Sequence, residues 1–152
     1  MRVLALDLSL NSTGVAFKNT KKKKIIHGLI KPPKDLKDQT DKIACTRSDV
    51  IKWCKKYKVN RVYMEELSFG SRGAAVHVLA KLHGVIQHTL RKRGIKWSTI
   101  PPTTVKKFVV GKGNAKKSMV MKALYKHFSI DVDQEDEADA IGVLLTGIGV
   151  GG

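Results

Sequence analysis

The 152-residue sequence has little cysteine, few acids and no long apolar run. Its two cysteines, Cys45 and Cys54, form no CxxC motif, so we expect reduced core thiols and no disulfide framework. No apolar run approaches the roughly 20 residues needed to span a bilayer. Met1 and Arg2 lead directly into a strand pattern, not into a signal peptide. These absences predict a soluble, cytoplasmic protein with no membrane partner.

Acids are scarce relative to bases, because 13 Asp and Glu stand against 29 Lys and Arg, giving a formal net charge of +16. Such a surplus repels itself in a small domain, and a polyanionic partner relieves the repulsion. Nucleic acid and an anionic membrane are the two candidate partners. The bases are spread over many segments and do not line one amphipathic face, which favours nucleic acid.

The hydrophobic pattern changes from strand to helix periodicity along the chain, with no repeat and no long linker. Three apolar runs separated by polar turns predict an antiparallel meander with a basic tip at 21–24. The strand, helix, strand succession that follows predicts a parallel crossover, which places the fourth strand beside the first. We expect an α/β fold with a five-stranded mixed sheet flanked by helices, in one domain over 1–148 with a flexible tail at 149–152. The expected strands lie at 3–6, 15–17, 25–30, 61–67 and 95–100, and the expected helices at 35–57, 74–93 (with Gly84 at a close helix or sheet approach), 103–110, 114–128 (capped by Asn114) and from 135 onward.

Isolated acids occur at the ends of two expected strands and at the start of the last helix. Asp7 ends the first strand, where a buried charge needs a cation, a metal ion or a proton, or else hydrogen-bonds the following turn. Glu65 and Glu66 end the fourth strand and point to opposite faces, so only one can join Asp7. Asp136 and Asp139 are three apart and share a helical face. The helix macrodipole alone also favours acids there, but the apolar neighbours of Asp139 indicate burial.

Three or four converging carboxylates suit hard divalent cations such as Mg²⁺, which take oxygen ligands and bind alongside substrate phosphates. Such a cluster can hold two ions about 4 Å apart, one activating a water and one stabilising the leaving oxygen of a phosphodiester. Four such acids in a protein this basic indicate a metal-dependent nuclease.

Four segments of the sequence are distinctive: LALDLSLNSTGVAF, MEELSFG, VKKFVVGKGNAKKSMV and DEADAIGV. Together they resemble the RuvC-type Holliday junction resolvases of the ribonuclease H-like or retroviral-integrase-like superfamily, over nearly the whole chain. The resemblance implies an endodeoxyribonuclease that resolves four-way DNA junctions by paired symmetric nicks, leaving 5′-phosphate and 3′-hydroxyl ends. It also implies Mg²⁺ as cofactor, with Mn²⁺ able to substitute and two ions per site, and a homodimer formed through the helix from Ala74 to Leu90.

The resemblance assigns roles to individual residues. It implies that Asp7, Glu65, Asp136 and Asp139 are the catalytic, metal-binding acids, and it selects Glu65 over Glu66. From the pattern alone, the aromatic in the loop after Glu65 is either a stacking platform for bases or a core residue that anchors the loop. The DNA-binding residues that the resemblance implies are Lys106 and Lys117 near the cleaved phosphate, and Phe69 in the loop after Glu65. We also expect Lys112, Lys116 and Arg72 to contact DNA, although Lys112 and Lys116 stand where the family often has uncharged residues.

Other functions share parts of this pattern. LALDLSLNSTG also resembles the phosphate loop of actin-like ATPases and sugar kinases, but those proteins need a second lobe, for which the chain is too short. A catalytically inactive DNA-binding module, an enzyme acting on RNA in a hybrid and a broader nuclease acting on forks and flaps are further alternatives, because recognition of DNA shape leaves no short motif. No motif identifies a branch-migration partner.

Overall fold

The computed structural model describes residues 1–67 and 73–151. Its centre is a five-stranded mixed sheet in the order β3-β2-β1-β4-β5. Strands β1, β2 and β3 form an antiparallel meander, β4 runs parallel to β1, and β5 runs parallel to β4. The elements are β1 (Arg2–Asp7), β2 (Thr13–Asn19), β3 (Ile25–Ile30), α1 (Gln39–Tyr57), β4 (Arg61–Glu65), α2 (Ala74–Lys92), β5 (Lys96–Ile100), α3 (Pro102–Val109), α4 (Lys117–Phe128) and α5 (Glu135–Gly151).

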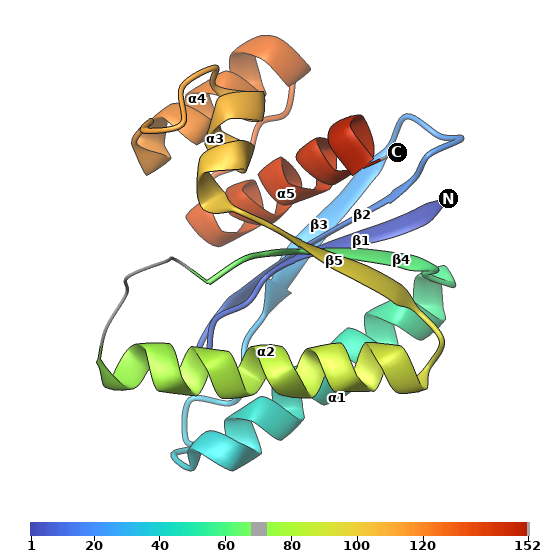
Figure 1. Cartoon of the computed structure of the whole chain (residues 1–152), viewed down its shortest axis with the longest axis vertical. Helices are drawn as coiled ribbons and strands as arrows, with labels where there is room; N and C mark the ends of the chain where they lie inside the picture. The colour runs from blue at the N-terminus through green and yellow to red at the C-terminus, as the bar shows by residue number, and fades with distance from the viewer. Residues whose placement is uncertain (68–72, 152) are drawn as a thin grey trace.

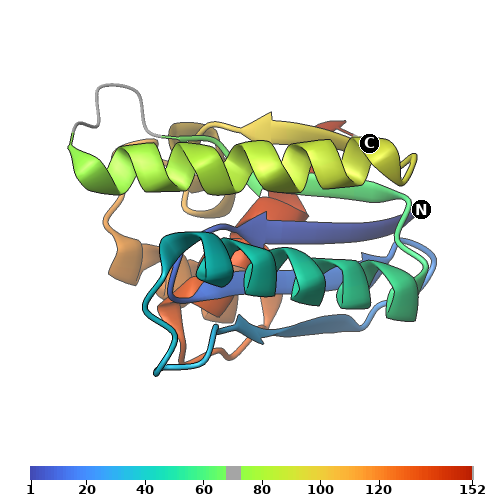
Figure 2. The same ribbon diagram turned by 90° about the horizontal axis from the view of Figure 1, so that it is seen from below.

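Helices cover both faces of the sheet. Helices α1 and α2 lie on one face, whereas α5 lies on the other, with α3 and α4 beside α5 (Figures 1 and 2). Alternation along β1 divides the core accordingly, because Val3 and Ala5 pack beneath α5 while Leu4 and Leu6 pack toward α1 and α2. Asp7 continues the alternation of Val3 and Ala5, so it ends the central strand on the α5 face.

The expected meander and parallel crossover are both confirmed. In β1 and β2, Asp7 lies opposite Gly14, and in the parallel pair Leu6 lies beside Met64 of β4. The sheet therefore places the ends of β1 and β4 side by side, which brings the acids at these ends toward the same edge. None of the described helices combines the length and apolar character needed to cross a membrane.

The glycine-rich end of the chain differs from the expected tail at 149–152. Helix α5 continues through Gly151, beyond the expected boundary at 148. A methyl group at Gly147 would lie 2.5 Å from Cγ of the Tyr63 ring, and one at Gly149 would lie 2.6 Å from Cζ of Phe108. These glycines therefore allow the end of α5 to approach two aromatic rings closely.

Two smaller expectations are wrong. Helix α4 begins at Lys117 with Lys116 as its N-cap, so Asn114 lies in the preceding turn and does not cap the helix. Gly84 is exposed on α2, and a methyl group there would meet nothing within 4 Å. Within the described part of the chain, Gly84 therefore serves no close approach to a helix or to the sheet.

Candidate active site

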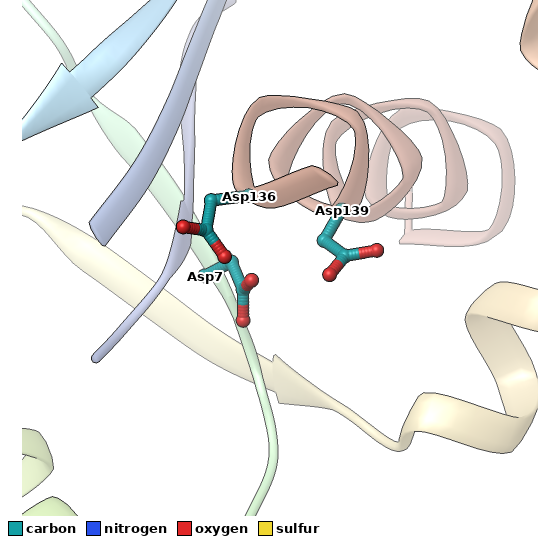
Figure 3. Close-up of side chains that lie close together, drawn as sticks. All are labelled: Asp7, Asp136 and Asp139. Atoms are coloured by element: carbon teal, nitrogen blue, oxygen red, sulfur yellow. The ribbon is translucent and has the colours of Figure 1, made fainter. Parts of the chain in front are cut away.

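Three aspartates from the two ends of the sequence meet on the α5 face of the sheet. Each of Asp7, Asp136 and Asp139 offers a carboxylate oxygen, and these oxygens lie within 4.8 Å of one another. Figure 3 shows Asp7 at the end of β1 beneath the first turns of α5, which contribute the other two. All three side chains are half-buried.

Close backbone packing sets the position of α5 over β1 and β2. Gly14 lies opposite Asp7, and a methyl group at Gly14 would lie only 1.8 Å from the backbone carbonyl oxygen of Asp136. Only a residue without a Cβ fits there. Two polar contacts hold the same helical turn, because Ser12 Oγ donates a hydrogen bond to Asp136 Oδ2 at 2.8 Å and His27 Nδ1 lies 3.1 Å from Glu137 Oε1.

Glu65 and Glu66 lie in different environments. Glu65 is the last residue of β4, and because side chains alternate along a strand it lies on the same α5 face as the buried Tyr63. Glu65 is half-buried, whereas Glu66 is exposed. Glu65 is the largest charged contributor to the raised pKa of Asp7, so the two carboxylates are electrostatic neighbours. Its oxygens lie outside the group of three aspartates that meet within 4.8 Å.

The acids destabilise one another's charged forms. Burial, followed by repulsion from Glu65, Asp139 and Asp136, raises the pKa of Asp7 from 3.8 to about 8. Burial also raises the pKa of Glu65, with repulsion from Asp139 as its largest electrostatic contribution. For Asp139, burial outweighs the opposing attraction of a nearby lysine, so its pKa is raised as well. The cluster therefore has more negative charge than its surroundings neutralise, which suits a bound cation.

One lysine lies directly beside the cluster. Lys117 Nζ is 3.5 Å from Asp139 Oδ2, and the attraction of Asp139 raises the pKa of Lys117. The charge of Lys106 on α3 partly opposes the rise in the pKa of Glu65, so this lysine also lies near the acids. Lys112 and Lys116 are exposed in the segment that joins α3 to α4. Phe69 and Arg72, the remaining expected DNA-binding residues, lie outside the described residues.

Sequence reasoning missed two residues that position the acids, Ser12 and Gly14. Both lie in the turn and strand start of the segment LNSTG, whose small and polar residues are typical of any turn. Their role depends on α5, which follows more than 120 residues later. A signal existed in the run Ser12-Thr13-Gly14, which begins five residues after Asp7, but it does not identify the contacting helix.

The sheet order, the parallel crossover and the covering α5 helix define a ribonuclease H-like fold. A solved structure of Thermus thermophilus RuvC in complex with Holliday junction substrate matches it with a TM-score of 0.83, at 18% identity over 97% of this chain and 93% of that one. The family model described as "Crossover junction endodeoxyribonuclease RuvC" matches residues 3–147. The chain belongs to this RuvC family.

Curated relatives match over nearly their full length. A protein of Rickettsia akari named crossover junction endodeoxyribonuclease RuvC is 31% identical, with 96% of this chain and 96% of the relative covered. A protein of the same name from Brachyspira hyodysenteriae is 29% identical, with 95% and 92% covered. The segments that first suggested this family thus belong to a similarity that extends across the whole domain.

Proposed function

We propose that the protein is a metal-dependent, structure-selective endodeoxyribonuclease that resolves four-way (Holliday) DNA junctions by paired symmetric nicks. The meeting of Asp7, Asp136 and Asp139 within 4.8 Å, in a chain of the RuvC family, supports this function above any other. The products would carry 5′-phosphate and 3′-hydroxyl ends. A cytoplasmic location is part of the same proposal.

The residues present fit divalent cations. Hard oxygen ligands converge at the cluster, and the raised pKa of Asp7 shows that its charge lacks compensation from the protein. We propose that Asp7, Glu65, Asp136 and Asp139 hold Mg²⁺, with Mn²⁺ able to substitute and two ions per site. When bound, the ions supply an activated water and stabilise the leaving oxygen of the phosphodiester.

The lysines beside the cluster provide the contacts to DNA in this proposal. Lys117, 3.5 Å from Asp139, and Lys106, whose charge acts on Glu65, are positioned to bind the scissile phosphate and to stabilise negative charge that develops during hydrolysis. The other proposed contacts are Lys112, Lys116, Phe69 and Arg72.

A homodimer matches the two-fold symmetry that paired nicks require. We propose that its interface includes the exposed side of α2, where Ala80 and Gly84 lie one turn apart and a methyl group at Gly84 would meet nothing within 4 Å. Gly84→Arg should leave the monomer folded but shift the molar mass measured by light scattering from dimer to monomer, whereas Gly84→Ala should remain dimeric. An unchanged mass for Gly84→Arg would exclude this side of α2 from the interface.

Cleavage of a labelled synthetic four-way junction tests the function directly. Wild type, Asp7→Asn and the control Asp49→Asn, which changes a surface acid paired with Lys52, are compared on the junction and on linear duplex in Mg²⁺, Mn²⁺ or EDTA. We expect paired symmetric nicks that require metal and Asp7, with junction binding retained in Asp7→Asn because affinity rests on phosphate contacts. Binding without cutting by wild type would refute catalysis, and equal cutting of forks and flaps would replace junction resolution by general debranching.

A further inference from the structure

A basic hollow adjoins the acid cluster along the same edge of the sheet. It has a volume of about 500 Å³ and is lined by Asn11, Ser12, Lys31, Lys34, Lys42 and two prolines. The pairing of the strands locates the hollow relative to Asp7. Asp7 of β1 lies opposite Gly14 of β2, and the preceding residue of β2, Thr13, lies opposite Ile30, the last residue of β3. Lys31 therefore follows β3 two strands away from Asp7, about 10 Å across the sheet. In Figure 2 the linker between β3 and α1 lies at this end of the sheet.

Hydrogen bonds connect the hollow to the acids. Lys42 Nζ donates to Asn11 Oδ1 at 2.9 Å, which joins the first turn of α1 to the turn between β1 and β2. The next residue of that turn, Ser12, donates from Oγ to Asp136 Oδ2. One side of the hollow is thus formed by the same turn that holds a carboxylate of the cluster.

The lining is complementary to phosphate. It contains three ammonium groups, a hydroxyl and an amide, and no acid. Among the described residues, no salt bridge involves Lys31, Lys34 or Lys42, so their charges are available to an outside anion. The nearby Asp38 caps α1, since its side chain accepts a hydrogen bond from the Asp41 backbone N–H.

We propose that this hollow binds a backbone phosphate of the DNA strand that is cut, a few nucleotides from the scissile phosphate. This inference rests on the proposed nuclease function and extends it with Lys31, Lys34 and Lys42. A strand that places its scissile phosphate at Asp7 and continues past the ends of β2 and β3 reaches the hollow within about 10 Å, which corresponds to a few phosphates at roughly 3.4 Å of helix axis each. The hollow would then fix the register and direction of the strand over the acids.

The test compares two variants with equal changes of charge. Lys31→Gln/Lys34→Gln alters the hollow, whereas the control Lys21→Gln/Lys23→Gln removes two exposed lysines from the turn between β2 and β3, at the opposite end of the sheet. Affinity for a labelled four-way junction is measured in EDTA at several salt concentrations. The fall of log affinity with log salt has a steepness of about 0.9 per phosphate contact, so losing the one proposed contact should make the slope shallower by roughly 1 in the hollow variant and change it little in the control.

Neutral methylphosphonates then locate the contact. Each junction carries one methylphosphonate at a different position along the strand that wild type cuts. At one of these positions the substitution should weaken binding by wild type but not binding by Lys31→Gln/Lys34→Gln, because the effects of two groups in direct contact are not additive. Equal salt slopes for the two lysine variants, or no coupling at any position, would refute the inference. Saturable binding of inorganic phosphate that is lost in the hollow variant, with unchanged junction affinity, would assign the hollow to a free anion and also refute it. Failure of wild type to cut any junction is a separate result that concerns the nuclease function alone.

Discussion

Replacing Gly14 by alanine should inactivate the acid cluster without changing any acid. The added methyl group would lie 1.8 Å from the backbone oxygen of Asp136 and 3.2 Å from Cβ of Ala140. Ordinary contact begins near 3.4 Å, so the first turn of α5 must move by about 1.6 Å, because a backbone carbonyl cannot rotate away as a side chain does. Asp136 and Asp139 would move with that turn, whereas Asp7 stays on β1.

A displacement of about 1 Å costs on the order of 100-fold in rate when reacting groups must be aligned. We therefore expect Gly14→Ala to lower single-turnover cleavage of a four-way junction at least 100-fold, with junction affinity in EDTA unchanged. Overpacking should also cost about 1–3 kcal/mol, which lowers the Tm by roughly 2–12 °C in a domain of this size.

Gly28→Ala is the matched control, because its methyl group would lie 3.4 Å from Cζ2 of Trp53, at ordinary contact distance on the neighbouring strand β3. Cleavage by Gly14→Ala within a few-fold of both wild type and this control would refute the claim that Gly14 positions α5.

Three further changes test the electrostatics and packing. Folding raises the pKa of Asp7 from 3.8 to about 8, so between these pH values the folded protein keeps a proton that the unfolded chain loses. Without metal, the free energy of unfolding should therefore fall by up to about 1.4 kcal/mol per pH unit between pH 5 and 8. Thermal melts in EDTA at several pH values should show this fall in wild type, whereas the dependence of stability on pH should be flatter in Asp7→Asn. The same pH dependence in both proteins would contradict the raised pKa of Asp7. Ser12→Ala removes the donor to Asp136 and should weaken Mg²⁺ activation 10- to 100-fold, seen as a higher Mg²⁺ concentration for half-maximal cleavage; an unchanged Mg²⁺ titration would count against a positioning role. Gly147→Ala places a methyl group against the ring of Tyr63 and should lower the Tm, whereas an unchanged melt would show that α5 has room to shift.

Local patterns in the sequence predicted the central features of the fold. The apolar run before Asp7 and the later strand, helix, strand succession were sufficient for the meander and the parallel pair, because both depend on short-range periodicity. Alternation also separates Glu65 from Glu66 once the buried side of Tyr63 is known. The placement of Asp7, Asp136 and Asp139 in one cluster was therefore predictable as soon as the last helix was assigned to that face.

The features that could not be predicted depend on contacts between distant segments. A glycine lowers helix propensity wherever it occurs, so Gly147 and Gly149 indicated a frayed end until their packing on aromatic rings was visible. Gly14 and Ser12 have the composition of an ordinary turn, and only the approach of α5 reveals their role. The basic hollow likewise joins three segments whose lysines, taken singly, resemble any solvated surface.

The cluster has a consequence for the timing of synthesis. Its first acid, Asp7, and its last, Asp139, are separated by 132 positions (139 minus 7), nearly the whole chain. At about 5–20 residues per second, a ribosome needs roughly 7–26 s to pass from one to the other. Throughout that interval the growing polypeptide has its basic amino-terminal strands but no complete set of acids. The proposed nuclease would therefore be inactive while nascent, and a chain released before α5 would lack two of the acids and the helix that covers this face of the sheet.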